Sequence, residues 1–407
     1  MLHFQYLQLS LKRILEEIIV NHSAIKNPKV SLLLQVTMVL NLLLHAYKGF
    51  IVSPYEKPIL SLMAIVFLLL TLWELKEDLV IKDLLVGLLL ATNVLYFRFI
   101  SQQGYASLLN NFPYFVIGYC LGLLFLYKSI PRFTMVLLVL LALAPFFYVL
   151  AVLKLESNGY ILFFNRNEIP ILLIPLVSLQ ILNEILQKRK HILLLPSIVL
   201  LAVSYLTKSR TGLLLSMCIV VMVAINDITL WLCEQRRKNG EFKKKLILVV
   251  LSALGIVMLG IYIFYLLWEN SRFVTDGFAS IEERFHIYVS FLSEMSLRDF
   301  LFGFRPQVMS VTHLHNSFFT MISYFGAVSI LYFTLILISL YRYSRTSIIL
   351  AGLLGIWILH SLVERTSPFL AGDFFIIPLV MSVFPAKRWN RKLITYFFKK
   401  KKGSSNE

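Results

Sequence analysis

The sequence is dominated by apolar segments that are long enough, or almost long enough, to cross a lipid bilayer. A spanning helix needs about 20 mainly apolar residues, and twelve such segments follow one another along the chain. They cover approximately residues 30–47, 58–75, 84–97, 112–127, 133–153, 169–187, 192–207, 212–233, 246–268, 317–340, 347–363 and 370–384. Because 58% of the residues are hydrophobic and only 15% are charged, a water-soluble globular protein is excluded. We therefore expect an all-α polytopic membrane protein with about 12 transmembrane helices.

Lysines and arginines are distributed unevenly between the two sides of these segments. With the N-terminus in the cytoplasm, 27 of the 39 fall on the cytoplasmic side, as the positive-inside rule requires. The weakest span, residues 84–97, is retained because losing it would reverse this distribution downstream. The cations on the cytoplasmic side flank the spans in blocks, which indicates that they bind anionic lipid headgroups. A nucleic-acid partner is not needed to explain them. We expect a multi-pass protein of the cytoplasmic membrane with both termini in the cytoplasm.

The predicted spans divide the chain into five regions. An amphipathic cytoplasmic or interfacial segment (1–29) precedes spans one to nine (30–268), an extracytoplasmic loop (269–316), spans ten to twelve (317–384) and a basic cytoplasmic tail (385–407). The loop has 48 residues, whereas the other outer links have 15 or fewer. Chemistry on the outer face is therefore expected in the loop. The cysteines lie in apolar segments and form neither a disulfide framework nor a zinc spacing, and we expect no cleavable signal peptide.

From residue 210 onward, every cation assigned to the outer face is an arginine. These residues are Arg210, Arg272, Arg284, Arg298, Arg305 and Arg365. Guanidinium groups bind phosphate oxygens in pairs and stay charged when partly buried, so they suit a phosphate or diphosphate ligand. The alternative is that they reach lipid headgroups or pair with carboxylates. Apolar segments flank the turn that carries Arg210, so this residue needs an anionic partner, either a ligand phosphate or a distant carboxylate.

Residues 281–295 have the pattern of an amphipathic helix. Apolar side chains recur at helical spacing, at Ile281, Phe285, Tyr288, Leu292 and Met295. Arg284 lies at the edge of this apolar stripe. A helix lying on the bilayer would place its guanidinium at the depth of lipid headgroups.

His313 and His315 directly precede the tenth span. Asn316 or Ser317 can act as the N-cap of that helix. His315 would then lie at the positive end of the helix dipole, which favours a neutral imidazole that can accept a proton. It is a candidate general base, and a structural histidine at a helix start is the alternative. The two histidines lack a third ligand at a recognised spacing, so we predict no metal site.

A second polar cluster lies at the outer junction of spans eleven and twelve. It comprises His360, Glu364, Arg365 and Asp373, which either line the same site or pair with other charges. His360 and Arg365 join Arg305, His313 and Asn316 as auxiliary candidates. The cytoplasmic face has no Walker loop, dinucleotide turn or nucleophile elbow, and we expect no cofactor.

The order of these elements resembles the O-antigen ligase and polysaccharide polymerase family. Ser209-Arg210-Thr211-Gly212 starts a late span, a large outer loop contains Arg284, and His315-Asn316-Ser317-Phe318 enters the next span. The likeness covers roughly residues 195–345. It implies a bundle similar to the GT-C glycosyltransferases that transfers a glycan from an undecaprenyl diphosphate carrier without a metal, inverting the anomeric centre, on the outer face. It also implies His315 as the base and Arg210 and Arg284 as diphosphate ligands. The second histidine, His313, departs from the family pattern.

Three functions are compatible with this resemblance. A polymerase joins carrier-linked repeat units into O-antigen or capsule, a ligase passes the glycan to a lipid A core, and a flippase moves lipid-linked sugars. We favour the polymerase because it is the more numerous class, and because a transporter would place its cations on both leaflets. The expected partners are the carrier-linked glycan, membrane lipids, a chain-length regulator and a flippase.

Overall fold

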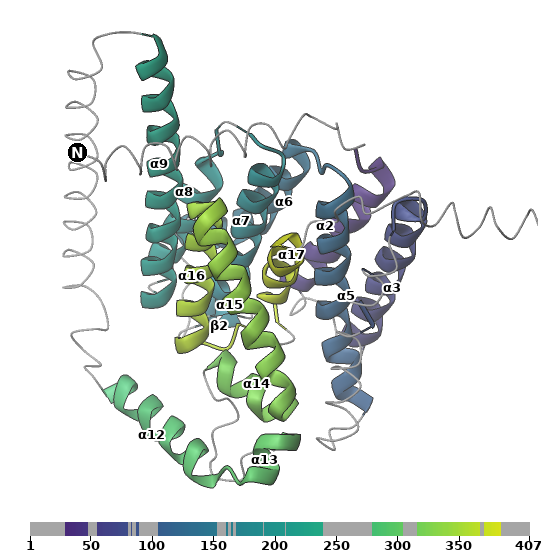
Figure 1. Ribbon diagram of the computed structural model, residues 1–407, viewed down its shortest axis with the longest axis vertical. Helices are drawn as coiled ribbons and strands as arrows, with labels where there is room; N and C mark the ends of the chain where they lie inside the picture. The colour runs from purple at the N-terminus through teal and green to yellow at the C-terminus, as the bar shows by residue number, and fades with distance from the viewer. Residues whose placement is uncertain are drawn as a thin grey trace, which may run out of the picture.

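The computed structural model describes residues 29–47, 55–79, 83, 87–88, 105–152, 160–161, 164–165, 168–189, 191–207, 209–238, 279–303, 316–366 and 370–383. These residues form helices that run side by side in a bundle (Figure 1), apart from a short antiparallel pair, β1 (Tyr160–Ile161) and β2 (Phe164–Asn165). The helices are α2 (Leu32–Ala46), α3 (Glu56–Leu75), α5 (Tyr105–Tyr127), α6 (Arg132–Phe147), η2 (Tyr148–Val152), α7 (Glu168–Leu186), α8 (Leu195–Leu206), α9 (Arg210–Lys238), α12 (Ala279–Glu294), α13 (Leu297–Phe302), α14 (Ser317–Phe325), η3 (Gly326–Val328), α15 (Ser329–Thr346), α16 (Ile348–Val363) and α17 (Asp373–Val383).

Five helical runs of the described chain are long and apolar enough to cross a membrane. They are Lys57–Leu75, Arg132–Leu150, Glu168–Leu186, Thr211–Ile228 and Ser317–Thr346. Five shorter helices are also apolar: Leu32–Ala46, Phe112–Tyr127, Leu195–Leu206, Ile348–Val363 and Asp373–Val383. The prediction of a helical polytopic membrane protein is therefore supported. The ninth predicted span (246–268), the terminal segments (1–28 and 384–407) and nearly all of the third span (84–97) lie outside the described residues.

The tenth predicted span, residues 317–340, lies within the apolar helical run Ser317–Thr346, but this run is not a single α-helix. The helix α14 ends at Phe325, and α15 begins at Ser329 after the short 3-10 turn η3. Gly326 has a φ of +54°, and a Cβ there would lie 2.5 Å from the carbonyl oxygen of Leu301. Only glycine fits this turn, because it must be left-handed and must touch the backbone of α13. Apolar periodicity does not reveal the break because both helices are apolar.

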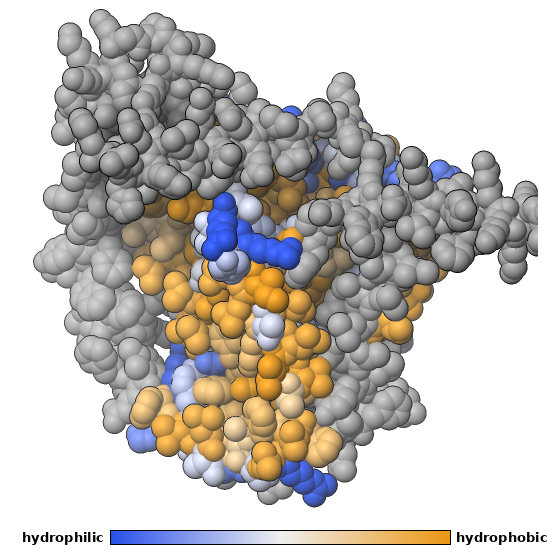
Figure 2. Space-filling view, viewed as in Figure 1, coloured by the Kyte–Doolittle hydropathy of each residue, from blue (hydrophilic) through white to orange (hydrophobic). Residues whose placement is uncertain are grey.

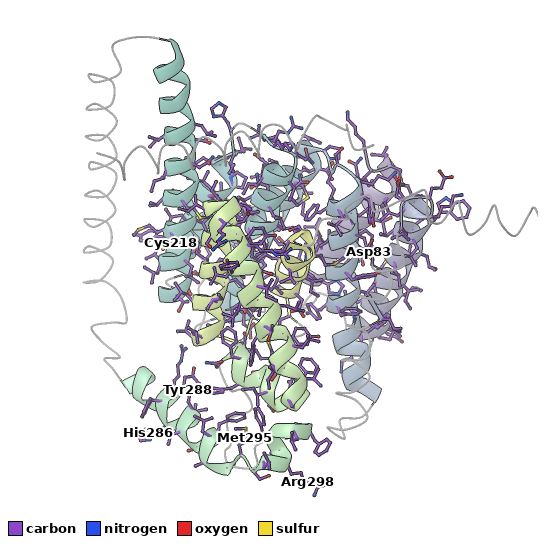
Figure 3. All side chains as sticks on the ribbon, in the orientation of Figure 1. Asp83, Cys218, His286, Tyr288, Met295 and Arg298 are labelled. Carbon is purple, nitrogen blue, oxygen red and sulfur yellow. The ribbon has the colours of Figure 1, made fainter. Side chains whose placement is uncertain are left out.

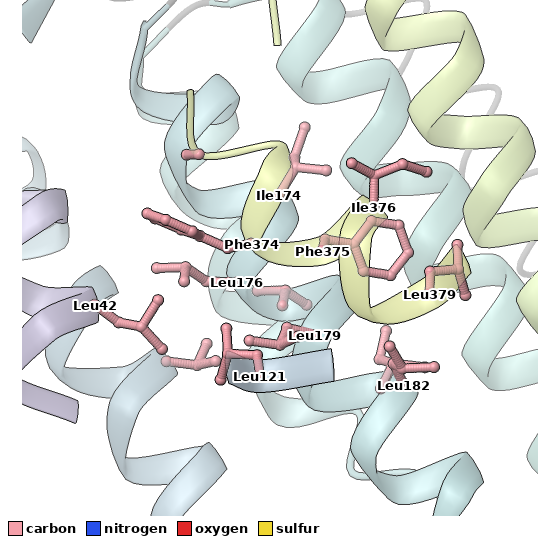
Figure 4. Packing of buried hydrophobic residues seen from close by; sticks show 14 of the residues in the cluster. Leu42, Leu121, Ile174, Leu176, Leu179, Leu182, Phe374, Phe375, Ile376 and Leu379 are labelled. Carbon is pink, nitrogen blue, oxygen red and sulfur yellow. The ribbon is translucent and has the colours of Figure 1, made fainter. Parts of the chain in front are cut away.

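The short helix α17 lies at the centre of the bundle. It contacts α5, α7, α15 and α16, and eight of its eleven residues are buried. Figure 4 shows its phenylalanines packed among leucines of other helices. Such a helix is apolar on every side because neighbours surround it. Peripheral helices instead expose large apolar side chains such as Leu69 and Leu337, and the front of the bundle is largely apolar (Figure 2), as expected of a surface that meets lipid.

The helices α5 and α17 approach each other closely at two glycines. Gly118 and Gly122 are four residues apart and therefore share one face of α5, the small-residue spacing typical of tightly packed membrane helices. A Cβ on Gly118 would lie 2.6 Å from the carbonyl oxygen of Asp373, and a Cβ on Gly122 would meet Met381. These contacts follow the same order along both helices, so the two helices are parallel. This agrees with the predicted topology, in which both spans begin on the same side.

Polar contacts gather at the two ends of the bundle. At one end, the buried carboxylate of Glu184 accepts hydrogen bonds at 3.0 Å from Nε and Nη2 of Arg132 and from the backbone N–H of Leu193. We call this the Arg132 end. At the opposite end, α12, α13 and α14 lie beyond the final turn of α16 (Figure 1), and we call it the Arg284 end. Pairing of this kind is expected for charges near an apolar bundle, because an unpaired charge there is costly.

We expect Gly118→Ala to destabilise the protein, since the new methyl group must push apart two backbones in contact. Unfolding in detergent, followed as a thermal transition, should show a lower midpoint. The matched control is Gly355→Ala, where nothing lies within 4 Å of the added Cβ. There the higher helix propensity of alanine, worth up to about 1 kcal/mol, should leave the midpoint unchanged or raised. Equal effects of both substitutions would contradict the close packing of α5 on α17.

Candidate functional site

The end of α16 is the point where three helices meet at the Arg284 end. The last carbonyl groups of a helix have no partner within it, and in an apolar environment they must find donors elsewhere. Here the unpaired carbonyls belong to the turn Leu362–Glu364. Side chains of α12 and α14 supply the donors.

The helix α12 provides two of these side chains. Arg284 donates from Nη1 to the carbonyl oxygen of Val363 at 2.7 Å and from Nη2 to the Glu364 carboxylate at 3.0 Å. The Glu364 side chain is only 8% exposed, and that of Arg284 is 28% exposed. Tyr288 donates its hydroxyl to the carbonyl oxygen of Leu362 at 3.2 Å. Burial raises the pKa of Tyr288, so its hydroxyl keeps the proton that this bond needs.

The start of α14 provides the other donors. The side chain of Asn316 caps the helix by accepting from the N–H groups of Phe318 and Phe319, which confirms the predicted N-cap. Its Nδ2 also donates to the carbonyl oxygen of Leu362 at 3.0 Å. The hydroxyl of Ser317 lies 3.2 Å from the carbonyl oxygen of Glu364. One asparagine thus orders α14 and joins it to α16.

Arg284 and Asn316 therefore bind the same three-residue turn, although 32 residues separate them in the chain. The family resemblance assigns Arg284 and the neighbour of Asn316, His315, to one site, but the shared contact with α16 was not predicted. Asn316 directly follows His315, so the backbone next to the predicted base reaches this turn. His313, His315 and Arg305 themselves lie outside the described residues.

The helix α12 has apolar side chains on more than one side. The helix forms as expected, but its inward face carries the buried Ile287 and Phe291, whereas Phe285 is 64% exposed. The rings of Tyr288 and Phe291 each lie 5.1 Å from that of Phe319. Figure 3 shows Tyr288 on the side of α12 that faces the bundle and His286 on the other side. The predicted stripe includes the exposed Phe285 and Leu292, but it also includes Tyr288, which contacts the bundle.

The helix α9 begins at Arg210, and its position is fixed by tight packing. Ser209 is buried and its Oγ accepts from the N–H of Gly212 at 3.3 Å, while a Cβ on Gly212 would collide with Pro170 of α7. Further along, Gly352 of α16 lies against Met222 of α9, and the two helices run in opposite directions (Figure 1).

This contact places the start of α9 at the level of the Arg284 end. Arg210 precedes Met222 by 12 residues, and Glu364 follows Gly352 by 12 residues. Twelve helical residues span about 18 Å. Because the helices are antiparallel, both separations run in the same direction from the contact between Met222 and Gly352. The side chain of Arg210 lies outside the described part of the chain.

The second predicted cluster is divided by the structure. Glu364 turns to Arg284, whereas the guanidinium carbon of Arg365 lies 5.2 Å from the ring centre of Tyr324. His360 is buried in the last turn of α16, and Asp373 is buried at the start of α17. The contacts described therefore link Glu364 to Arg284 and leave Arg365 oriented toward a different helix.

Comparison with protein-family models, curated proteins and solved structures finds no match for this chain. Among the residues that the structure describes, no three histidine, cysteine or carboxylate side chains gather closely enough to hold a metal ion.

We predict a favourable coupling between Arg284 and Glu364. Arg284→Gln and Glu364→Gln should each lower the thermal midpoint in detergent, but the double variant should lose less than the sum, with a coupling of about 1 kcal/mol. Removing one partner leaves a charge in a partly apolar environment, whereas removing both does not. The pair Arg132→Gln and Glu184→Gln serves as reference at the other end. Strict additivity of the Arg284 and Glu364 effects would contradict the ion pair.

Proposed function

We propose that this protein is a membrane glycosyltransferase that polymerises undecaprenyl-diphosphate-linked repeat units into a surface polysaccharide on the outer face of the cytoplasmic membrane. One observation carries the proposal: Arg284 and Asn316 bind the same turn at the end of α16. A phosphate-binding cation and the residue beside a candidate base thus belong to one small region. Reacting groups held together in this way are what a direct displacement between two bound lipids requires.

The proposed reaction is a single displacement. His315 takes the proton of the acceptor hydroxyl, whose oxygen attacks the anomeric carbon of the donor sugar. The bond between that carbon and the diphosphate oxygen breaks, and the electron pair leaves with the diphosphate. Arg210 and Arg284 stabilise the charge that develops on the leaving group. The anomeric configuration is inverted, without a covalent intermediate, cofactor or metal.

The ion pair with Glu364 is compatible with a role for Arg284 in binding diphosphate. A guanidinium group has five N–H donors, and only two of them are used in the contacts with Val363 and Glu364. The side chain is 28% exposed, so part of the guanidinium-bearing side chain stays accessible. Glu364 then holds the guanidinium plane in a fixed orientation, which favours recognition of a planar pair of oxygens.

The outer surface of α12 and α13 supports a place at the membrane surface. Phe285, Val289, Leu292 and Leu297 are all at least 48% exposed. Apolar side chains in this arrangement suit the interface between headgroups and acyl chains. A carrier lipid lying there would present its diphosphate at the depth of Arg284. A flippase and a chain-length regulator are the protein partners that this function implies.

The base assignment predicts that His315→Ala abolishes polymer formation while His313→Ala retains most of it. General base catalysis typically contributes 10²–10⁴-fold, so a loss of at least about 100-fold is expected. The assay uses purified protein in detergent with carrier-linked repeat units, and product length is read on gels. Because detergent removes sidedness, polymer formed there also rules out a flippase. If product appears only after lipid A core is added, the protein is a ligase instead.

Binding of diphosphate by a guanidinium fork predicts that Arg210→Lys loses activity although the charge is retained. The lysine ammonium cannot form two parallel hydrogen bonds with neighbouring oxygens, so a drop of about tenfold or more in kcat/KM is expected. The control is Arg298→Lys, because Arg298 is exposed on α13 and has no role in the proposed reaction. Unchanged turnover in Arg210→Lys would reduce Arg210 to a residue that contacts headgroups.

A further inference from the structure

Arg365 lies in the turn that follows α16, directly after Glu364, and its contacts distinguish it from the other described arginines at this end. Its guanidinium carbon is 5.2 Å from the ring centre of Tyr324 on α14. Its Nε atom is buried and has no hydrogen-bond partner among the described residues. The side chain is thus held in place by an aromatic face while a buried donor stays unused.

The polar neighbours of Arg365 are committed elsewhere. Glu364 accepts from Arg284, and the Thr366 hydroxyl lies 2.7 Å from that of Ser361 and 3.2 Å from that of Ser317. Of the three charged residues around this turn, Arg284 and Glu364 neutralise each other. Arg365 therefore supplies the net positive charge of the group.

A buried N–H group without an acceptor is unfavourable, and a ligand commonly completes such a group in native proteins. The missing partner of a guanidinium is an anionic oxygen, and phosphate offers several at the spacing of the fork. Stacking on Tyr324 restricts the orientation of the guanidinium plane before a ligand arrives. These observations call for a phosphate-bearing ligand near the membrane surface.

We propose that Arg365 binds a phosphate group of a membrane-embedded ligand beside Tyr324. This inference rests on the proposed function for the identity of the ligand, which is then the diphosphate of the isoprenoid carrier. Arg284 contacts Val363 and Glu364, and Arg365 is the next residue of the same turn, so the proposed phosphate site lies at the same end of the bundle as Arg284. An ordinary phospholipid offers the same phosphate chemistry, and the experiment separates the two sources.

The test measures binding of geranylgeranyl diphosphate to the full chain in phosphatidylcholine nanodiscs. We expect Arg365→Gln to weaken binding by about tenfold or more, as for the loss of a charge-assisted hydrogen bond. The matched control is Arg345→Gln. The guanidinium carbon of Arg345 also lies over a tyrosine ring, 4.2 Å from the ring centre of Tyr341. Arg345 is exposed and lies near the C-terminal end of α15, whereas α14 precedes the N-terminal end of that helix. This control should bind like the unaltered protein.

Thermal unfolding without ligand separates binding from a structural role. If the Nε donor is idle until a ligand arrives, Arg365→Lys and Arg365→Met should melt no lower than the unaltered protein, because they remove an unsatisfied group. Both should nevertheless bind geranylgeranyl diphosphate more weakly. A lower midpoint with unchanged affinity would instead show that Arg365 only stabilises the fold, and it would overturn the proposal.

Competition identifies the source of the phosphate. Displacement of geranylgeranyl diphosphate by inorganic pyrophosphate, but not by added phosphatidylglycerol, supports the isoprenoid carrier. Displacement by phosphatidylglycerol supports the phosphate site but assigns it to a phospholipid headgroup. Equal affinity of Arg365→Gln and Arg345→Gln for all three probes would overturn the inference. Because no sugar is transferred in this assay, a protein that binds the diphosphate but never forms polymer would contradict the proposed function alone.

Discussion

The carbonyl groups at the end of α16 impose the constraint on which the candidate site depends. An apolar helix that ends at the edge of a membrane must give its last carbonyls to donors other than water. The chain meets this need with Arg284 and Tyr288 from α12 and with Asn316 and Ser317 from α14. The same hydrogen bonds that satisfy the backbone also hold the loop helix against the bundle. Stability and the arrangement of the site therefore have a common origin.

This origin explains why Arg284 and Asn316, 32 residues apart in the chain, contact the same turn. The turn Leu362–Glu364 fixes the register of α12 through Arg284, and it fixes the start of α14 through Asn316. The break at Gly326 then frees α14 from the direction of α15, and α13 packs into the corner that results.

Much of the fold is readable from the sequence because apolar length and periodicity are local properties. They predicted the described spans, the loop helix and the cap at Asn316. They could not predict the break at Gly326, because flanking apolar residues hide it, or the direction of Arg284. That direction depends on the aromatic contacts of Tyr288 and Phe291 with Phe319, which are contacts between distant segments. Glu364 was noted as polar, but nothing in its neighbourhood in the sequence identifies Arg284 as its partner.

The distribution of charge at the Arg284 end gives the proposed chemistry a consistent electrostatic basis. Among the residues described around the end of α16, Arg284 and Glu364 form an ion pair, Arg365 carries a further positive charge, and the N-terminal end of α14 adds partial positive charge through its dipole. The proposed base, His315, directly precedes this cap in the sequence. A histidine at such a position is held neutral more easily than one beside carboxylates, while a leaving diphosphate is stabilised. One positive field thus favours both the base form of the imidazole and departure of the anion, which a site built around an unpaired carboxylate could not do.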